Sequence, residues 1–301
     1  MHISICVKEI LDFLQIQPGQ RGLDATLGYG GHTLEMLKCL KGEGHIYGLD
    51  VDPIESEKTK ERLKKQGFGE DILTVKLLNF RNIDQVAEEA GKFDFVLADL
   101  GVSSMQIDNP ERGFSYKVDG PLDLRMNPQK GISAAQRLKE VTQEELYGML
   151  LENADEPYAE EISKAVIRQR RIRPVETTTD LKQVIEQALS FIPEKERKEA
   201  VKKSCQRSFQ ALRIDVNSEF EVLYDFLEKL PQVLAPNGRA AILTFHSGED
   251  RLVKKSFKQF YKEGIYSDIS KNVIRPSQEE CARNSRARST KMRWAIRAQE
   301  I

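Results

Sequence analysis

Short apolar segments alternate with amphipathic segments along the first hundred residues of the chain. Apolar segments of strand length occupy 20–26, 45–52, 72–78 and 93–100, and helical patterns occupy 32–41, 53–66 and 83–90. The segment 93–100 is apolar almost throughout, which is typical of a strand buried on both faces of a parallel sheet. This alternation predicts a doubly wound, mostly parallel α/β sheet.

The pattern changes after residue 101. Residues 103–132 are rich in Gly, Pro, Asn and Asp, which predicts a long loop. Two helical faces follow without a strand pattern, one at Tyr158, Ile162, Ala165 and Val166 and one at Leu181, Val184, Ile185, Ala188 and Leu189. Alternation then resumes with a helix at 219–234, a turn at 235–238, a strand at 239–245, a helix at 248–262 and a strand at 291–297. We therefore expect an α/β domain in two parts, 1–104 and 206–301, with a helical domain inserted at 105–205.

Composition narrows the class of protein. The chain has 301 residues, with 46 Lys and Arg against 47 Asp and Glu, which excludes a uniformly basic nucleic-acid binder but permits local basic patches. The first ten residues carry charges, unlike a signal peptide, and no segment reaches the about 20 apolar residues of a membrane span. The cysteines, at 6, 39, 205 and 281, form no CxxC pair, which predicts reduced thiols and no zinc site. We expect a cytoplasmic protein without a membrane segment or a metal.

A glycine-rich turn, Asp24-Ala-Thr-Leu-Gly-Tyr-Gly-Gly-His32, follows the first predicted strand. Glycines allow the backbone to approach a ligand closely at the carboxyl edge of a parallel sheet. A nicotinamide fingerprint would place a third glycine at position 33, where this chain has Thr33. Asp50, 20 residues after Gly30, ends the second strand, where a carboxylate accepts hydrogen bonds from both ribose hydroxyls. The pair suits a nucleoside cofactor without a pyrophosphate, such as S-adenosyl-L-methionine, although a purely structural turn remains the alternative.

Five blocks of sequence, in order along nearly the whole chain, resemble the bacterial MraW family of 16S rRNA (cytosine-N4)-methyltransferases. They span 24–32, 99–126, 207–219, 244–254 and 286–289. The resemblance implies a class I, Rossmann-like methyltransferase with a helical domain inserted after strand four. It also implies S-adenosylmethionine as cofactor and, as substrate, a decoding-centre cytidine of 16S rRNA in the small ribosomal subunit.

The same resemblance implies the residues of a cofactor site. The family's cofactor contacts fall on Gly30, Gly31, His32, Asp50, Phe80, Asp99 and Gln106. Asp50 would bind the ribose, Phe80 would lie against the adenine, and Asp99 would accept from the cofactor's amino group or from the base. A core position for Phe80 and a turn-capping role for Asp99 are the alternatives.

Methylation of cytosine N4 requires hydrogen-bond acceptors, because the N4 lone pair is delocalised into the ring and N4 must lose a proton. Many amino-methyltransferases carry Asp-Pro-Pro-Tyr or Asn-Pro-Pro-Tyr after strand four, and this chain does not. We hypothesise that Asp99, Ser103 and Ser104 form the catalytic set. His246, at the end of a later strand, is interpreted as a structural hydrogen-bonding residue that merits one mutant.

Three basic stretches are candidates for RNA contact. Lys164, Arg168 and Arg171 share one helix face, Arg207 and Arg213 lie in the basic segment 195–213, and Arg286 and Arg288 lie in the basic tail. Solvated helix faces are the alternative for each stretch. A flipped or single-stranded cytidine is expected, since N4 is paired inside a duplex.

Other functions stay open at this point. The chain departs from the family pattern at Met105, Asn127, Gly248 and Ser285, which is compatible with a divergent paralogue that methylates another RNA cytidine. A non-catalytic RNA-binding protein of ribosome assembly would show a degraded cofactor pocket, and Thr33 disfavours a nicotinamide oxidoreductase. The oligomeric state, monomer or homodimer, is not determined by the sequence.

Overall fold

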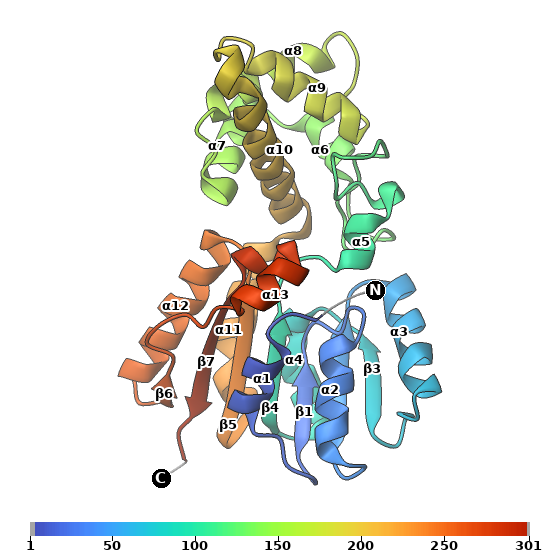
Figure 1. Ribbon diagram of the computed structural model, residues 1–301, viewed down its shortest axis with the longest axis vertical. Coiled ribbons are helices and arrows are strands. Elements are labelled where there is room, and N and C mark those ends of the chain that lie inside the picture. Colours follow the sequence, from blue (N-terminus) through green and yellow to red (C-terminus); the bar gives the residue numbers. More distant parts are fainter. Residues whose placement is uncertain (1–3, 300–301) are drawn as a thin grey trace. The chain divides into compact units, whose positions relative to one another are not determined.

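The computed structural model describes residues 4–299 and divides into two compact units (Figure 1). One unit comprises the chain up to Gly101 and from Phe220 onward, and the other comprises Val102–Glu219. The insertion therefore ends at residue 219, beyond the predicted boundary at 205. The reason is that one helix, α10 (Glu194–Asn217), runs across residue 205 and buries Cys205, Phe209 and Leu212 in the core of the insertion.

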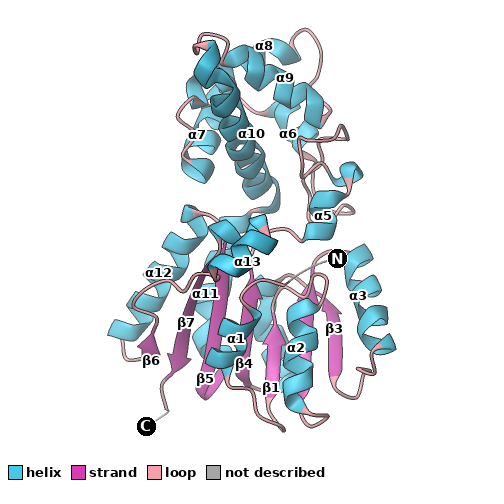
Figure 2. Cartoon of the chain, in the orientation of Figure 1, coloured by secondary structure: helices cyan, strands magenta, loops and turns pink. Residues whose placement is uncertain are grey.

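A seven-stranded sheet forms the centre of the first unit, in the order β3-β2-β1-β4-β5-β7-β6 (Figure 2). Within the run β3-β2-β1-β4-β5 all neighbouring strands are parallel, and β7 is antiparallel to both β5 and β6. The strands are β1 (Arg21–Asp24), β2 (His45–Asp50), β3 (Leu73–Leu77), β4 (Phe93–Asp99), β5 (Leu234–Thr244), β6 (Tyr266–Ile269) and β7 (Lys291–Arg297). The expected doubly wound, mostly parallel sheet is confirmed.

Helices cover both faces of this sheet, because each strand presents apolar side chains in both directions. Along β4, Phe95 and Leu97 enter one apolar core with helices α1, α2 and α3, while Val96 and Ala98 enter another with α4, α11 and α12. These helices are α1 (Val7–Leu14), α2 (Gly31–Leu40), α3 (Pro53–Lys65), α4 (Ile83–Ala90), α11 (Glu219–Val233) and α12 (Ser247–Lys262). The nearly continuous apolar sequence of β4 is thus explained by burial on two sides.

The predicted elements of the first unit agree with the structure within about two residues, with informative exceptions. Helix α1, strand β6 and helix α13 (Gln278–Arg283) were not predicted. Strand β6 and α13 are short, whereas α1 has a strongly amphipathic sequence that could have been recognised. The predicted turn at 235–238 lies inside β5, where Asn237 has a φ of 61° and the register to β4 shifts. Asp52, by contrast, accepts from the N–H groups of Ile54 and Glu55, as its position before Pro53 indicated.

The second unit is helical. It contains α5 (Ser104–Asp108), α6 (Ala134–Glu140), α7 (Gln143–Ala154), α8 (Ala159–Arg170), α9 (Thr178–Ala188) and α10, with short 3₁₀ turns. The two predicted apolar faces, on α8 and α9, both lie against its core. Within residues 4–299 no helix is both long enough and apolar enough to cross a membrane.

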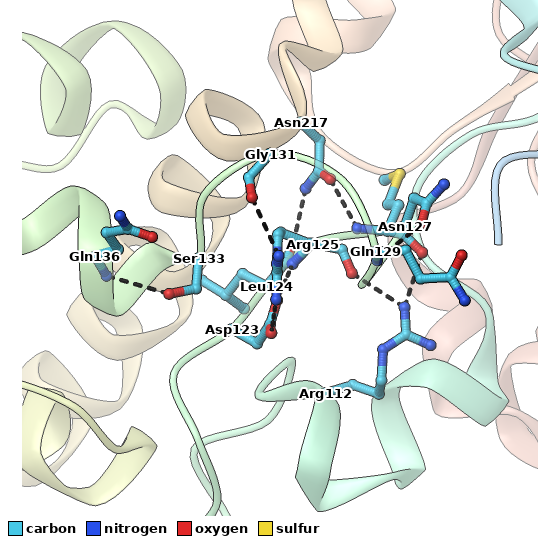
Figure 3. A network of polar contacts seen from close by, with 11 residues as sticks. Arg112, Asp123, Leu124, Arg125, Asn127, Gln129, Gly131, Ser133, Gln136 and Asn217 are labelled. Atoms are coloured by element: carbon cyan, nitrogen blue, oxygen red, sulfur yellow. Dashed lines mark hydrogen bonds and ion pairs between the residues drawn. The ribbon is translucent and has the colours of Figure 1, made fainter.

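A strained segment of the second unit is fixed by polar side chains (Figure 3). Leu124 is buried yet has a φ of 63°, a conformation that costs a branched side chain free energy unless its surroundings enforce it. Asn217, at the end of α10, donates to the carbonyl of Leu124 and accepts from the N–H of Met126. Arg112 donates to the carbonyls of Arg125 and Met126. The segment 124–126 is therefore held in one conformation from both sides.

Candidate active site

The carboxyl ends of three adjacent strands bring three predicted elements together. Strand β1 lies between β2 and β4, and all three run parallel. Asp50 is the last residue of β2, Asp99 is the last residue of β4, and the glycine turn follows β1 between them. This edge, where the strand order changes direction, is the usual ligand crevice of a doubly wound sheet.

The glycine turn has little freedom to move. Gly28 and Gly30 have φ angles of 48° and 79°, in the left-handed region that favours glycine. The N–H of Gly28 donates to Asp50 Oδ2 at 3.0 Å, and its carbonyl accepts from Thr59 Oγ1 at 2.6 Å. A Cβ on Gly30 would lie only 2.7 Å from Thr59 Cγ2. The backbone between β1 and α2 is thus pre-formed for close approach to a ligand.

Asp24, the last residue of β1, anchors both sides of this turn. Its carboxylate accepts from the hydroxyl of Thr33 at 2.6 Å and from the N–H of Thr26 at 3.0 Å. The Thr26 hydroxyl in turn accepts from the N–H of Asp99 at 2.6 Å. Thr33 therefore has a structural partner at the position where a nicotinamide site would have glycine. The sequence signal for Asp24 was its place at the end of a strand, but its role as an anchor was not predicted.

Asp50 combines burial with two backbone hydrogen bonds. Oδ2 accepts from Gly28 and Oδ1 accepts from the N–H of Asp52 at 2.9 Å. Burial raises the pKa of Asp50 to about 6, although the backbone donors oppose that shift. Each carboxylate oxygen keeps a second lone pair. An ionised Asp50 can therefore still accept from hydroxyl groups of a bound nucleoside.

Asp99 has an unusual environment for a carboxylate. Oδ1 is enclosed and has no hydrogen-bond partner among the described residues, and Oδ2 lies 3.5 Å from His32 Nδ1. Burial raises the pKa of Asp99 to about 6; the His32 ring lowers it, whereas Asp24 and Glu249 raise it further. A buried acceptor without a partner is a site at which a ligand donor gains a hydrogen bond.

The ring of His32 lies among protein atoms, and contact of this residue with a cofactor stays a prediction. Both ring nitrogens face protein atoms, with Nε2 2.8 Å from the carbonyl oxygen of Ile5 and Nδ1 facing Asp99. Gly31 is the first residue of α2 and His32 follows it, so both present backbone N–H groups at the start of that helix. The His32 ring is therefore held by protein atoms on both sides.

Phe80 begins a short 3₁₀ turn after β3, where Asn79 caps the turn. Its ring is half-buried and meets Phe226 edge to face, with centroids 5.2 Å apart. Phe80 thus partly occupies a core position, which was the alternative to contact with adenine, because one edge of its ring packs on the core of the sheet. The incomplete burial still leaves ring surface for an adenine.

Ser103, Ser104 and Gln106 belong to the helical unit, at the start of α5. Ser103 accepts from the N–H of Gln106, and the Gln106 side chain accepts from the N–H of Ser103, which forms a capping box. The pattern Ser-x-x-Gln is itself a sequence signal for this box, and it was not used. Ser103 and Gln106 therefore have structural roles that the resemblance did not indicate.

His246 precedes α12, and neither of its ring nitrogens has a hydrogen-bond partner among the described residues, so its interpretation as a structural hydrogen-bonding residue is not confirmed. Nε2 lies 3.2 Å from Glu249 Oε1, and Glu249 Oε2 accepts from the N–H of Phe245. Asp250 binds Arg293 of β7 through both carboxylate oxygens, at 2.7 and 3.2 Å. Both acids lie in the first turn of α12, and the structure gives each a specific partner.

The predicted RNA-contact residues are not equivalent. Arg168, Arg171, Arg286 and Arg288 are exposed, and Lys164 is exposed and paired with Glu160. Arg207 is half-buried and lines a hollow of about 420 Å³ on the helical unit, together with Tyr158, Lys195 and Lys203. Arg213 binds Glu219 through Nε at 2.7 Å and Nη2 at 3.0 Å, with only 16% of its side chain exposed. Arg213 is therefore not among the proposed RNA contacts.

The sheet order, the glycine turn after β1 and the acids that end β2 and β4 define a Rossmann-like methyltransferase that uses S-adenosylmethionine. The model of the MraW methylase family matches residues 1–298, and the chain belongs to this family. It is 72% identical over 99% of its length to ribosomal RNA small subunit methyltransferase H 1 of Lachnoclostridium phytofermentans, covering 82% of that protein. It is 69% identical over 99% of its length to the protein of the same name from Agathobacter rectalis, covering 86% of it.

One solved structure, a SAM-dependent O-methyltransferase from Thermotoga maritima, matches 100% of this chain and 68% of its own at 9% identity. Its TM-score of 0.47 makes the likeness too distant to add to the family assignment.

Proposed function

We propose that this chain transfers a methyl group from S-adenosylmethionine to the exocyclic N4 of a decoding-centre cytidine in 16S rRNA of the small ribosomal subunit. The names of the similar proteins support a small-subunit rRNA substrate. N4 is proposed as the methylated atom because of the family resemblance and because residues at the end of β4 offer hydrogen-bond acceptors to an amino group. A ribosomal substrate implies that the protein works in the cytoplasm.

The residues at the edge of the sheet fit the cofactor. When bound, S-adenosylmethionine supplies an electrophilic methyl group on a sulfonium. The left-handed backbone at Gly30 and the start of α2 at Gly31 allow close approach, and the Asp50 carboxylate would accept from the ribose hydroxyls. The remaining surface of Phe80 would lie against the adenine.

The observation that carries the proposal is the enclosed, unpartnered Oδ1 of Asp99. An amino group donates hydrogen bonds, and an acceptor that lacks a donor in the protein gains most from binding one. Accepting from N4 turns the nitrogen lone pair out of conjugation with the ring and toward the methyl group. Asp99 is therefore the proposed catalytic acceptor, at the end of a strand that backbone hydrogen bonds fix on both sides.

Ser103 and Ser104 remain secondary members of the proposed catalytic set. The Ser103 hydroxyl accepts from the N–H of Gln106, and it keeps its own hydrogen for donation. Ser104 is the first residue of α5 and is half-buried. Gln106 is proposed to act toward the cofactor mainly by shaping this helix start, since its side-chain oxygen already accepts from Ser103.

The RNA would be bound by exposed basic side chains on both units. The proposed contacts are Lys164, Arg168, Arg171 and Arg207 on the helical unit and Arg286 and Arg288 near the end of the chain. With a net charge of -1, non-specific attraction to RNA is weak, which favours recognition of a pre-folded small-subunit particle over arbitrary RNA.

The test combines a deletion strain with a defined variant. Loss of the gene is expected to remove N4-methylation at one 16S cytidine in nucleoside mass spectrometry, and re-expression is expected to restore it. The Asp99→Asn protein is expected to restore less than about 1% of the methylation rate while it remains folded. Unchanged N4-methylcytidine in the deletion strain would favour a paralogue with another target, and full activity of Asp99→Asn would remove Asp99 from catalysis.

A further inference from the structure

The His32 ring has a defined tautomer. Nε2 lies 2.8 Å from the carbonyl oxygen of Ile5, and a carbonyl oxygen can only accept, so Nε2 must carry a hydrogen. In the neutral ring, Nδ1 then has a lone pair and no hydrogen. This lone pair faces Asp99 Oδ2 at 3.5 Å, and the His32 side chain is only 9% exposed.

Two acceptors therefore face each other when His32 is neutral and Asp99 is ionised. One proton placed between Nδ1 and Oδ2 would give both atoms a hydrogen-bond partner, whichever atom carries it. Little water reaches this pair from the His32 side, so an incoming proton must come through the open side of Asp99, whose side chain is 29% exposed. The His32–Asp99 pair can therefore bind one proton.

Segments from both ends of the chain fix the ring in this orientation. The N–H of Cys6 donates to Glu280 Oε1 at 2.8 Å, which ties the segment carrying Ile5 to α13. Ser277 caps α13 by accepting from the N–H of Glu280, which fixes Glu280 in the first turn of that helix. Ile5 itself is buried in the core beneath α1 and α2. The carbonyl oxygen of Ile5, which accepts from His32 Nε2, is therefore held in place by these contacts.

We propose that His32 is a positioning residue that makes Asp99 a proton acceptor for the methyl transfer, so that the His32–Asp99 pair takes the proton lost by N4. This inference rests on the proposed function. As the N4–methyl bond forms, the methyl–sulfur bond breaks and its electron pair stays on sulfur, which leaves N4 with one surplus proton. That proton passes to Asp99, is shared with His32 Nδ1, and leaves to solvent after product release.

Other ionisable groups face the pair and set its pH range. Asp24 and Glu249 act on Asp99, and Cys6, which lies with Glu9 and Glu280 in a cluster whose ligand atoms are within 4.8 Å of one another, is also in its field. The acids raise the pKa of Asp99, and the His32 ring lowers it. With its pKa raised to about 6 by burial, Asp99 is ionised and able to accept a proton above pH 6 and is protonated below it.

The kinetic test is the pH profile of single-turnover methylation by wild type and by His32→Phe, which keeps a ring but has no nitrogen. Wild type is expected to lose activity below about pH 6. In His32→Phe this acid limb is expected to move to higher pH, because a ring that carries the shared proton no longer holds the pKa of Asp99 down. The rate at pH 7 is expected to fall about tenfold, with the KM for S-adenosylmethionine unchanged.

The matched control is His45→Phe, since His45 bonds Thr74 Oγ1 in the same unit and begins β2, at the opposite edge of the parallel strands from Asp99, which ends β4. It is expected to retain the wild-type profile. An acid limb that stays in place in His32→Phe would overturn the proposal.

A second readout needs neither RNA nor activity. The ¹⁵N NMR signals of the His32 ring in the cofactor-free wild type are expected to show hydrogen on Nε2, with a signal change near pH 6 that reports protonation of Asp99 and is absent in Asp99→Asn. Hydrogen on Nδ1 in the neutral ring, or the same signal change in Asp99→Asn, would overturn the proposal even if His32→Phe failed to fold. If wild type methylates no rRNA but the ring behaves as expected, the proposed function fails and the pair stands.

Discussion

The N–H of Gly28 donates to Asp50 Oδ2 at 3.0 Å, so the glycine turn after β1 and the acidic end of β2 are bonded to each other before any ligand arrives. The second carboxylate oxygen accepts from Asp52, which ties the same side chain to the start of α3. The Asp50 carboxylate therefore holds the backbone of the glycine turn and of the start of α3 in place, and it still has lone pairs for a ligand. An enzyme site organised in this way needs little rearrangement on binding.

Asp50→Asn tests this double role. The amide has one acceptor oxygen in place of two, so either Gly28 or Asp52 loses its bond, and the free energy of unfolding is expected to fall by about 1–2 kcal/mol. Loss of a charged acceptor for ribose hydroxyls is expected to weaken S-adenosylmethionine binding about a hundredfold in calorimetry. The exposed Asp71→Asn is the control. Wild-type affinity in Asp50→Asn would contradict the ribose assignment.

Gly30→Ala and Gly42→Ala separate backbone strain from steric contact. Both glycines have φ near 80°, which costs an alanine about 1 kcal/mol. A Cβ on Gly42 meets nothing within 4 Å, whereas a Cβ on Gly30 lies 2.7 Å from Thr59 Cγ2. Urea unfolding is expected to show a loss of about 1 kcal/mol at position 42 and about 3 kcal/mol at position 30. Equal losses would mean that the turn and α3 separate easily.

Asp99 makes stability and catalysis depend on pH in opposite directions. Its pKa is raised by burial to about 6 from 3.8, so the folded state binds the proton more tightly than the unfolded state. The contribution of this group to stability is fully present below pH 3.8 and is lost as the pH rises through 6. Relative to Asp99→Asn, wild type is expected to become less stable by about 2 kcal/mol between pH 4 and pH 8. A difference that is constant over this range, measured by denaturant unfolding, would contradict the raised pKa.

Asn217→Ala tests the polar contacts around Leu124. The Asn217 side chain makes bonds to the backbone of Leu124, Met126 and Arg213, and its loss frees the strained segment. The expected cost is about 3 kcal/mol in the helical unit, seen as faster amide exchange at the end of α10. Asn127→Ala, which removes one exposed bond to the N–H of Gln129, is the matched control and should cost less than about 1 kcal/mol.

The ends of the parallel strands are the part of this site that the sequence predicts well. The alternation of strands and helices places Asp24, Asp50 and Asp99 at one edge, because parallel strands end together. The acceptor for His32 could not be predicted in this way. Ile5 acts through its backbone carbonyl, and Glu280 comes from the other end of the chain, so no spacing in the sequence relates either of them to His32.

The helical unit shows which local signals were available and which were not. The capping box of Ser103 and Gln106 follows a known four-residue pattern and could have been recognised. Arg213 looked like a phosphate-binding residue because charge runs do not reveal partners. Its ion pair with Glu219 forms only where α10 ends and the chain turns, which also sets the true boundary of the insertion at 219.

Salt dependence distinguishes phosphate contacts from structural arginines. Arg168→Ala and Arg171→Ala each remove one exposed charge, so each is expected to lower the affinity for 16S rRNA fragments and to reduce the slope of log K against log salt by about 1. Arg213→Ala is expected to lower stability instead, because it leaves Glu219 without its partner. Filter binding between low and physiological salt gives the slopes.

The control for these slopes is Lys60→Ala. It removes a charge on α3, in the unit that contains the sheet, where Lys60 pairs with Glu70. It should leave both affinity and slope unchanged. The two arginine variants are expected to differ from Lys60→Ala in the slope of log K against log salt, since a general change in net charge would affect all three variants alike. Unchanged slopes for Arg168→Ala and Arg171→Ala would show that this face of α8 is a solvated surface and that the RNA contacts lie elsewhere.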